Sequence, residues 1–313
     1  MLTQLLNRLL LSIPVLFGVL ALGFGLLQLV PGDPAIVFAG PTATEDVVEA
    51  IRREMGLDQP VVTQFFLYLA RLLEGDMGRS LISNKTVVSE LGGAIGPTAE
   101  LMAACLIWSI PLGILMGALA AAARGSILDR LVMAFSVAGV SLPVFFIGLV
   151  LIQYLGVAWR MFPFLGRAGP IWTLEGLNHI VLPALSLGLI FVGPVARMTR
   201  SSVLEVLRLD HVRTARAKGL SETQVLLRHG LRNALIPVVT LVGLQAGYLL
   251  GGAVVTESIF SWPGVGRLAV GAILSSDFPL AQGAILTLAL AFIVINMIVD
   301  VAYAALDPRV RGA

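Results

Sequence analysis

Few residues in this 313-residue chain could do chemistry, and they are not grouped as a catalytic site requires. The three histidines, His179, His211 and His229, stand apart, and the single cysteine, Cys105, lies within an apolar run. One cysteine excludes a disulfide framework and a cysteine metal site. The sequence has no Gly-x-x-x-x-Gly-Lys-[Ser/Thr] loop, no His-Glu-x-x-His motif and no Gly-x-Ser-x-Gly elbow. It therefore lacks these motifs of nucleotide hydrolysis, zinc proteolysis and serine hydrolysis.

The most informative spacing lies in one basic segment, residues 200–234. Its apolar residues Val206, Leu209 and Val212 recur three apart, with basic residues between them. Gly219 separates two helix-compatible stretches, and the second begins with a Ser-x-x-Gln pattern typical of a capping box. We predict two short helices joined at this glycine. The pattern is compatible with a plain basic loop beside a membrane and with a surface that binds a partner protein.

The elements that position this segment are predicted to be membrane helices. The composition is 57% hydrophobic and 13% charged, whereas a soluble domain has about a quarter charged residues. Crossing the hydrocarbon core takes about 20 apolar residues. We therefore predict an all-α integral membrane protein with about six transmembrane helices. The six apolar segments are Leu9–Val30, Thr98–Ala123, Leu131–Val157, Ile180–Thr199, Leu235–Thr256 and Leu280–Leu306.

Lysine and arginine are unevenly divided between the two sides of this predicted membrane protein. One side holds both termini, the Arg124–Arg130 turn and the Thr199–Ala234 segment with Arg197 at its entry, and it carries 13 of the 21 basic residues. Basic residues favour the cytoplasmic side, so both termini are predicted to be cytoplasmic. The net charge of +2 does not suggest a nucleic-acid-binding protein.

Residues 31–97 are then predicted to lie on the external side of the membrane. They contain helix start and stop signals that predict a small helical cap. Thr42-x-x-Glu45 fits a capping box before an amphipathic run that ends near Gly56, and a second helix is predicted over Val61–Glu74, ended by Gly75. We divide the chain into residues 1–30 with the first span, the cap at 31–97, and a five-helix core at 98–313 that includes the 200–234 loop.

A resemblance to a known family rests on motifs in a fixed order. Thr214-Ala-Arg-Ala-Lys-Gly219, followed by Asn233-Ala-Leu-Ile-Pro237, resembles the cytoplasmic coupling (EAA) loop of ABC importer permeases of the dipeptide/oligopeptide/nickel class. The supporting segments are Leu29–Pro34, Gly56–Pro60, Gly75–Ser80, Glu257–Leu268 and Asp307–Arg309. The strict pattern is not kept, because Arg213 stands where the family has glutamate and Arg232 where it has proline.

The resemblance implies a permease subunit in the bacterial inner membrane, with no enzymatic activity and no cofactor of its own. Its expected partners are two ATP-binding subunits that hold ATP and Mg²⁺, a second and non-identical permease, and a periplasmic substrate-binding protein. The expected cargo is short peptides, with glutathione next. A nickel chelate is less favoured because the chain offers no His/Cys cluster.

The resemblance also assigns residues to the contact with an ATP-binding subunit, whereas candidates for the pathway come from polar and aromatic residues in or beside the spans. A helix over Leu204–Lys218 is expected to sit in a groove on an ATPase, with Gly219 turning the chain back. The coupling set is Val206, Leu209, Asp210, Val212, Arg213, Ala215, Arg216, Lys218 and Gly219. Glu257, Trp262 and Gln245 are candidates for the pathway or its gate, with Glu257 expected in solvent at a span end. Apart from the resemblance, Asp300 lies near the cytoplasmic end of the last span, where an ordinary helix–helix or interface pair is the first expectation and a part in coupling is the alternative.

Two other classes of function fit the sequence less well. A proton-coupled secondary transporter needs a relay of buried carboxylates or histidines, and the three separated histidines do not form one. Uptake that persists without a partner ATPase would favour it. A membrane enzyme would need an activity in the isolated chain, and no catalytic motif supports one.

Overall fold

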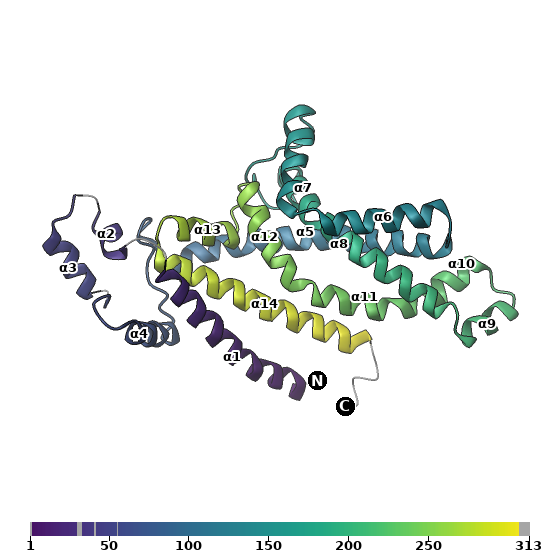
Figure 1. Cartoon of the computed structure of the whole chain (residues 1–313), viewed down its shortest axis with the longest axis horizontal. Helices are drawn as coiled ribbons and strands as arrows, with labels where there is room; N and C mark the ends of the chain where they lie inside the picture. Colours follow the sequence, from purple (N-terminus) through teal and green to yellow (C-terminus); the bar gives the residue numbers. More distant parts are fainter. Residues whose placement is uncertain (1, 30–32, 41, 55, 307–313) are drawn as a thin grey trace. The chain divides into compact units, whose positions relative to one another are not determined.

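The computed structural model describes all residues except 1, 30–32, 41, 55 and 307–313, and the described chain is almost entirely helical (Figure 1). Its α-helices are α1 (Leu2–Leu27), α2 (Pro34–Ala39), α3 (Glu45–Glu54), α4 (Val61–Leu73), α5 (Val87–Ala122), α6 (Ile127–Ser141), α7 (Val144–Leu151), α8 (Leu174–Val206), α9 (Asp210–Ala217), α10 (Glu222–Gln224), α11 (Arg232–Leu244), α12 (Ala246–Ile259), α13 (Val265–Leu274) and α14 (Phe278–Leu306). Two π-helical segments, η1 (Ile152–Ala158) and η2 (Val225–Leu231), complete the order.

The chain forms two compact units. The core unit comprises Ala99–Ser261 and Val294–Ala313, and the cap unit comprises Leu2–Thr98 and Trp262–Ile293. The first part of α5 and the first part of α14 therefore belong to the cap unit.

Among the described residues, up to six segments could cross a membrane by length and composition. Four are single helices, with apolar stretches at Leu10–Leu27, Val87–Ala122, Leu174–Val206 and Phe278–Val299. Two more are bent pairs, Ile127–Gly139 with Val144–Ala158 and Glu222–Arg228 with Asn233–Leu244. The all-α membrane fold predicted from the sequence is confirmed.

Two of the predicted spans are not single helices. The predicted span Leu131–Val157 bends by 104° between its two halves. Pro143 causes the break, because it lacks a backbone N–H and starts α7 with ψ at 143°. The predicted span Leu235–Thr256 is divided between α11 and α12 at Gln245. Low helix propensity at the nearby Gly243 and Gly247 favours a break there.

The core unit is assembled around α8. Within the described chain, 72% of the apolar stretch of α8 is buried, against 17% in α1. Glycines let its neighbours approach closely: a Cβ on Gly117 of α5 would lie 2.4 Å from the Ala196 carbonyl oxygen. A Cβ on Gly193 of α8 would lie 2.5 Å from the Ser136 carbonyl oxygen of α6. Small residues at helix contacts are the usual device for packing helices within a membrane.

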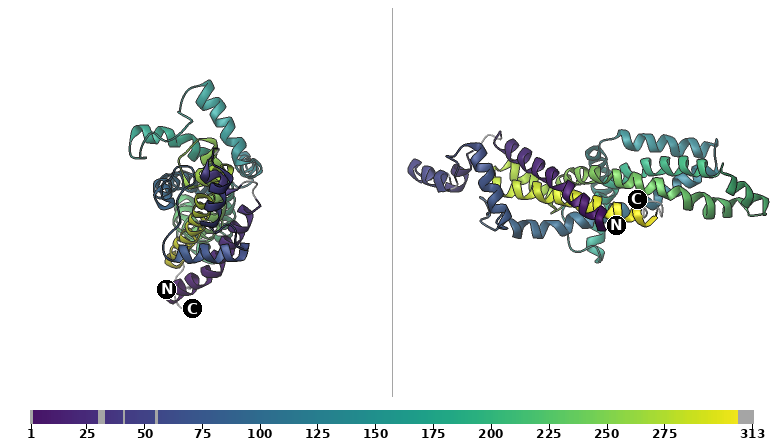
Figure 2. Two further views of the ribbon diagram at one scale, coloured as in Figure 1. Left: turned by 90° about the vertical axis from the view of Figure 1, so that its left-hand side faces the viewer. Right: turned by 90° about the horizontal axis from the view of Figure 1, so that it is seen from below.

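In the cap unit, α1 runs beside the first part of α14 (Figures 1 and 2), and a Cβ on Gly23 would lie 3.2 Å from Ile285 Cγ2. The start of α5 packs on the same helix, with Val87 and Leu91 buried against Ala284. The Ser80 hydroxyl donates to Asp277 Oδ2 at 2.5 Å, which ties the loop before α5 to the residue preceding α14.

The two cap helices are close to those predicted. Helix α3 ends before Gly56 at φ +71°, and α4 ends before Gly75 at φ +83°. One detail differs: α3 begins at Glu45, so Glu45 is its first residue rather than the third residue of a helix capped by Thr42.

Candidate functional site

The basic segment forms an elbow between the end of α8 and the start of α11. It is built from α9, α10 and η2 (Figure 1). The predicted continuous helix Leu204–Lys218 is interrupted, because α8 ends at Val206 and α9 starts at Asp210. Leu209 is extended (φ −73°, ψ 150°) and its N–H donates to the Val206 carbonyl oxygen at 3.1 Å. Turning here places Leu207 against two separate apolar clusters of the core unit, which accounts for the break.

Gly219 ends α9 in the manner predicted. Its φ is +84°, and its N–H donates to the Arg216 carbonyl oxygen at 2.9 Å. The Leu220 N–H donates to the Ala215 carbonyl oxygen at 3.3 Å. These two bonds form a Schellman motif, a helix ending that strongly favours glycine at the left-handed position.

The helix after the turn is capped by its own side chains, as predicted. The Ser221 hydroxyl accepts from the Gln224 N–H at 3.4 Å, and the Ser221 N–H donates to the Gln224 side chain at 3.2 Å. Arg216 adds a bridge across the turn: Nε and Nη2 donate to the two carboxylate oxygens of Glu222 at 2.8 and 3.0 Å. The elbow is therefore held by the backbone, a capping box and one bidentate ion pair.

The predicted coupling residues divide into an inner and an outer set. Val212 and Ala215 are buried against Val225, and Val206 is partly buried in the same cluster. Leu209 is 48% exposed and is the exposed member of the three-residue apolar pattern. The other exposed members of the set are Asp210, Arg213, Arg216, Lys218 and Gly219.

A buried ion pair that the sequence reasoning missed lies at the α5–α6 turn of the core unit. Asp129, 4% exposed, accepts from Arg200 Nε at 2.5 Å and from Arg200 Nη2 at 2.7 Å. It also accepts from the Gly125 N–H at 2.9 Å. The pair fastens the turn to α8 six residues before α8 ends. The sequence feature that could have indicated this pair is Asp129, a single acidic residue between Arg124 and Arg130.

A second missed pair holds the loop before α8. Arg167 donates through Nε and Nη2 to the two carboxylate oxygens of Glu100, each at 2.8 Å. The same loop is held by a backbone bond from the Gly166 N–H to the Phe260 carbonyl oxygen at 2.8 Å. These bonds connect α5, the loop and the end of α12.

The three candidates for the pathway or gate lie in different settings. Glu257 is fully buried in α12, which corrects the expectation of a solvated carboxylate at a span end. Thr256 and Phe260 are fully buried too, so this end of α12 is enclosed by the protein. Trp262 is also fully buried, and its Nε1 donates to the Pro97 carbonyl oxygen at 2.8 Å within the cap unit. Gln245 stands half-buried at the α11–α12 break. The side chain of Asp300 lies outside the described residues, as does the Asp307–Arg309 motif.

Comparison with known proteins identifies the family to which this helical architecture belongs. A family described as the inner membrane component of binding-protein-dependent transport systems matches residues 109–312, and its N-terminal companion family matches residues 1–89. The chain belongs to this family. It is therefore an inner-membrane permease subunit of an ABC importer, as its motifs indicated.

Full-length relatives are similar throughout. The glutathione transport system permease protein GsiC of Escherichia coli strain K12 is 44% identical over 311 residues, which covers 99% of both chains. The same figures hold for GsiC of Escherichia coli O6:H1 strain CFT073 and of Shigella dysenteriae serotype 1. The similarity spans the cap helices, the core and the elbow.

Proposed function

We propose that this permease subunit carries short peptides, glutathione among them, from the periplasm into the cytoplasm, with ATP and Mg²⁺ held by partner subunits. The observation that carries the proposal is the 44% identity to glutathione permeases over 99% of the chain. The chain itself supplies the pathway and no catalysis. Its partners are two ATP-binding subunits, a second and non-identical permease, and a periplasmic binding protein, with both termini of this chain in the cytoplasm.

The elbow is proposed to be the contact with an ATP-binding subunit. Its outer surface offers the exposed apolar side chain of Leu209 beside Asp210, Arg213 and Lys218, a composition suited to a groove with an apolar floor and a polar rim. The inner residues support this surface instead of touching the partner, because Val212 and Ala215 are used in the elbow's own cluster.

The internal bonds of the elbow suit a part that transmits movement. The Schellman motif, the capping box and the Arg216–Glu222 pair hold α9 and α10 as one piece. The elbow is joined directly to α8 and α11, which are membrane helices of the core unit. A rigid-body shift of the ATPase would therefore move these helices together, as in other switching proteins.

Leu209→Asp tests the contact. The tagged chain is co-expressed with its partner subunits, purified in mild detergent, and assayed for co-purified ATPase and for uptake in liposomes. Placing a carboxylate in an apolar contact should release the ATPase or uncouple hydrolysis from uptake, because an unpaired charge is costly to bury. Leu73→Asp is the matched control, since Leu73 is 89% exposed on the cap.

Wild-type uptake in Leu209→Asp would contradict the assignment of the elbow. Solute movement by the purified chain alone, without any ATPase, would contradict the ABC mechanism and favour a secondary transporter.

A further inference from the structure

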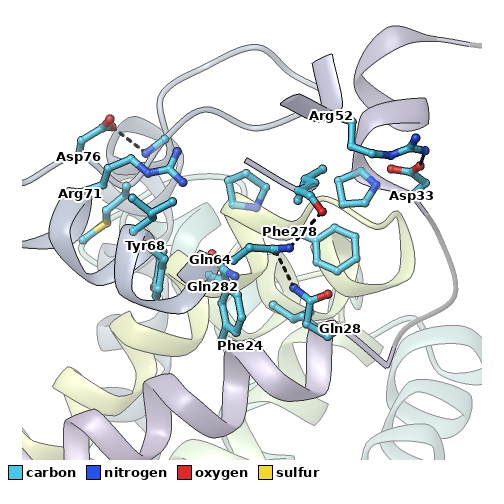
Figure 3. Close-up of a pocket in the computed structure, with 17 residues that line it drawn as sticks. Phe24, Gln28, Asp33, Arg52, Gln64, Tyr68, Arg71, Asp76, Phe278 and Gln282 are labelled. Carbon is cyan, nitrogen blue, oxygen red and sulfur yellow. Dashed lines mark hydrogen bonds and ion pairs between the residues drawn. The ribbon is translucent and has the colours of Figure 1, made fainter. Parts of the chain in front are cut away.

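A cavity of about 360 Å³ lies inside the cap unit, where the coupling mechanism gives it no role (Figure 3). Its walls come from the end of α1, the start of α2, the end of α3, the middle of α4, the loop after α4 and the first turns of α14. Small-molecule sites have volumes of roughly 300–1,000 Å³. The cavity is therefore large enough for a molecule of a few residues.

Three polar side chains of this wall have no hydrogen-bond or ion-pair partner among the described residues. The hydroxyl of Tyr68 is buried and unbonded, and neither the Arg71 guanidinium nor the Gln282 amide is bonded to another described side chain or backbone group. Burial raises the pKa of Tyr68 to about 12, so its hydroxyl is a neutral donor at physiological pH. Of these three groups only the Tyr68 hydroxyl is buried, since Arg71 is exposed and Gln282 is partly buried. A buried donor usually has a partner, because leaving one unbonded is costly.

Other groups of the wall are already held in place. Gln28 Nε2 donates to Gln64 Oε1 at 3.2 Å, and Gln64 Nε2 donates to the Gln59 carbonyl oxygen at 2.8 Å. Figure 3 shows Gln28, Gln64 and Gln282 gathered between the rings of Phe24 and Phe278. Fixed amides between apolar rings are typical of sites that orient a small polar ligand.

The charges of the wall are balanced. Arg52 and Asp33 pair with each other on one side, and Arg71 and Asp76 lie on the other (Figure 3). Asp76 accepts one hydrogen bond, from the Gly78 N–H at 2.8 Å. Two arginines and two aspartates give no net charge, which suits a ligand that carries one charge of each sign.

We propose that this cap pocket binds a zwitterionic peptide of two or three residues before it enters the pathway. Arg71 binds the terminal carboxylate with Tyr68 as a second donor, and Asp76 with the glutamine amide oxygens accepts from the ammonium group. The class of ligand rests on the proposed function, whereas the place of binding rests on the pocket.

The test is direct binding of radiolabelled trialanine to the assembled complex in nanodiscs, without ATP and without the periplasmic binding protein. The expected result is saturable binding that weakens about tenfold or more in Arg71→Gln and severalfold in Tyr68→Phe, as expected for a charged and a neutral hydrogen bond. Trialanine amide and N-acetyl-trialanine, each lacking one charge, should compete poorly. Arg53→Gln, which changes an arginine of the cap outside the pocket, should bind like the wild type.

The results that would contradict the pocket differ from those that would contradict the proposed function. A wild-type complex that couples ATP hydrolysis to peptide uptake but binds no trialanine would overturn the pocket alone. Equal binding by Arg71→Gln and Tyr68→Phe, or equal competition by the blocked peptides, would also overturn it. Tyr68→Phe removes one oxygen only, so it remains informative if Arg71→Gln assembles poorly. A complex without ATP-driven uptake of any peptide would contradict the proposed function instead.

Discussion

At the scale of single residues, Gly219 shows how one backbone angle shapes the elbow. Its φ of +84° lets the chain reverse while Ala215 and Arg216 still receive hydrogen bonds at their carbonyl groups. A side chain here would meet no atom within 4 Å, so crowding does not demand glycine. The backbone conformation does, because left-handed geometry costs other residues about 1–2 kcal/mol.

Gly219→Ala is therefore expected to weaken the elbow by about 1–2 kcal/mol and to lower the peptide taken up per ATP hydrolysed. Gly219→Pro should be more severe, because proline fixes φ near −65°. The measurement is uptake and hydrolysis in the same proteoliposomes. Gly271→Ala is the control, since Gly271 also has no atom within 4 Å but lies in the regular helix α13. Equal coupling ratios for both alanine variants would contradict the role of the turn.

At the scale of elements, the position of α8 depends on glycines of its neighbours. Gly117 of α5 lies against the backbone of α8, where a Cβ would be 2.6 Å from the Thr199 Cβ as well as close to the Ala196 carbonyl. The buried Asp129–Arg200 pair then fixes the α5–α6 turn to the same helix. Movement of the elbow at the end of α8 should therefore reach α5 and α6 through packing.

Gly117→Ala should destabilise the core unit by about 1–3 kcal/mol, the usual cost of overpacking. Backbone atoms of α8 cannot rotate away as a side chain could. The measurement is thermal unfolding of the purified chain in detergent, monitored by its tryptophan fluorescence. Gly96→Ala, on the same helix with no atom within 4 Å, should unfold at or above the wild-type temperature. An unchanged Gly117→Ala protein would show that α5 does not pack on α8 in this way.

At the scale of the whole molecule, the elbow and the cap must face opposite sides of the membrane for the proposed cycle to work. The cap pocket would receive peptide from the periplasm, and the elbow would receive the movement of an ATPase in the cytoplasm. The orientation can be tested by labelling introduced cysteines, because the one native cysteine, Cys105, is buried.

We expect Leu73→Cys to react with a membrane-impermeant maleimide on intact spheroplasts, and Lys218→Cys to react only after permeabilisation. The physical reason is the concentration of lysine and arginine around the elbow, which favours the cytoplasmic side. Labelling is read by mass shift, and the wild-type chain reports any reaction at Cys105. The reverse labelling pattern would invert the proposed orientation.

Local features of the candidate site were readable from the sequence. The turn at Gly219 and the Ser221–Gln224 box depend on groups within five residues of each other, so residue types and spacing were enough to predict them. The outward or inward direction of Val212 was not readable. It depends on Val225, which reaches the same cluster only after the chain has turned back.

The sequence by itself determined that this protein is a helical membrane permease. Apolar segments of spanning length can satisfy their backbone in lipid only as helices here, and ordered motifs identify the family. Tertiary structure alone decided the burial of Glu257, the Asp129–Arg200 pair and the cap pocket. These features join residues far apart in the chain or depend on which neighbours surround a side chain, and such contacts leave no periodic pattern in the sequence.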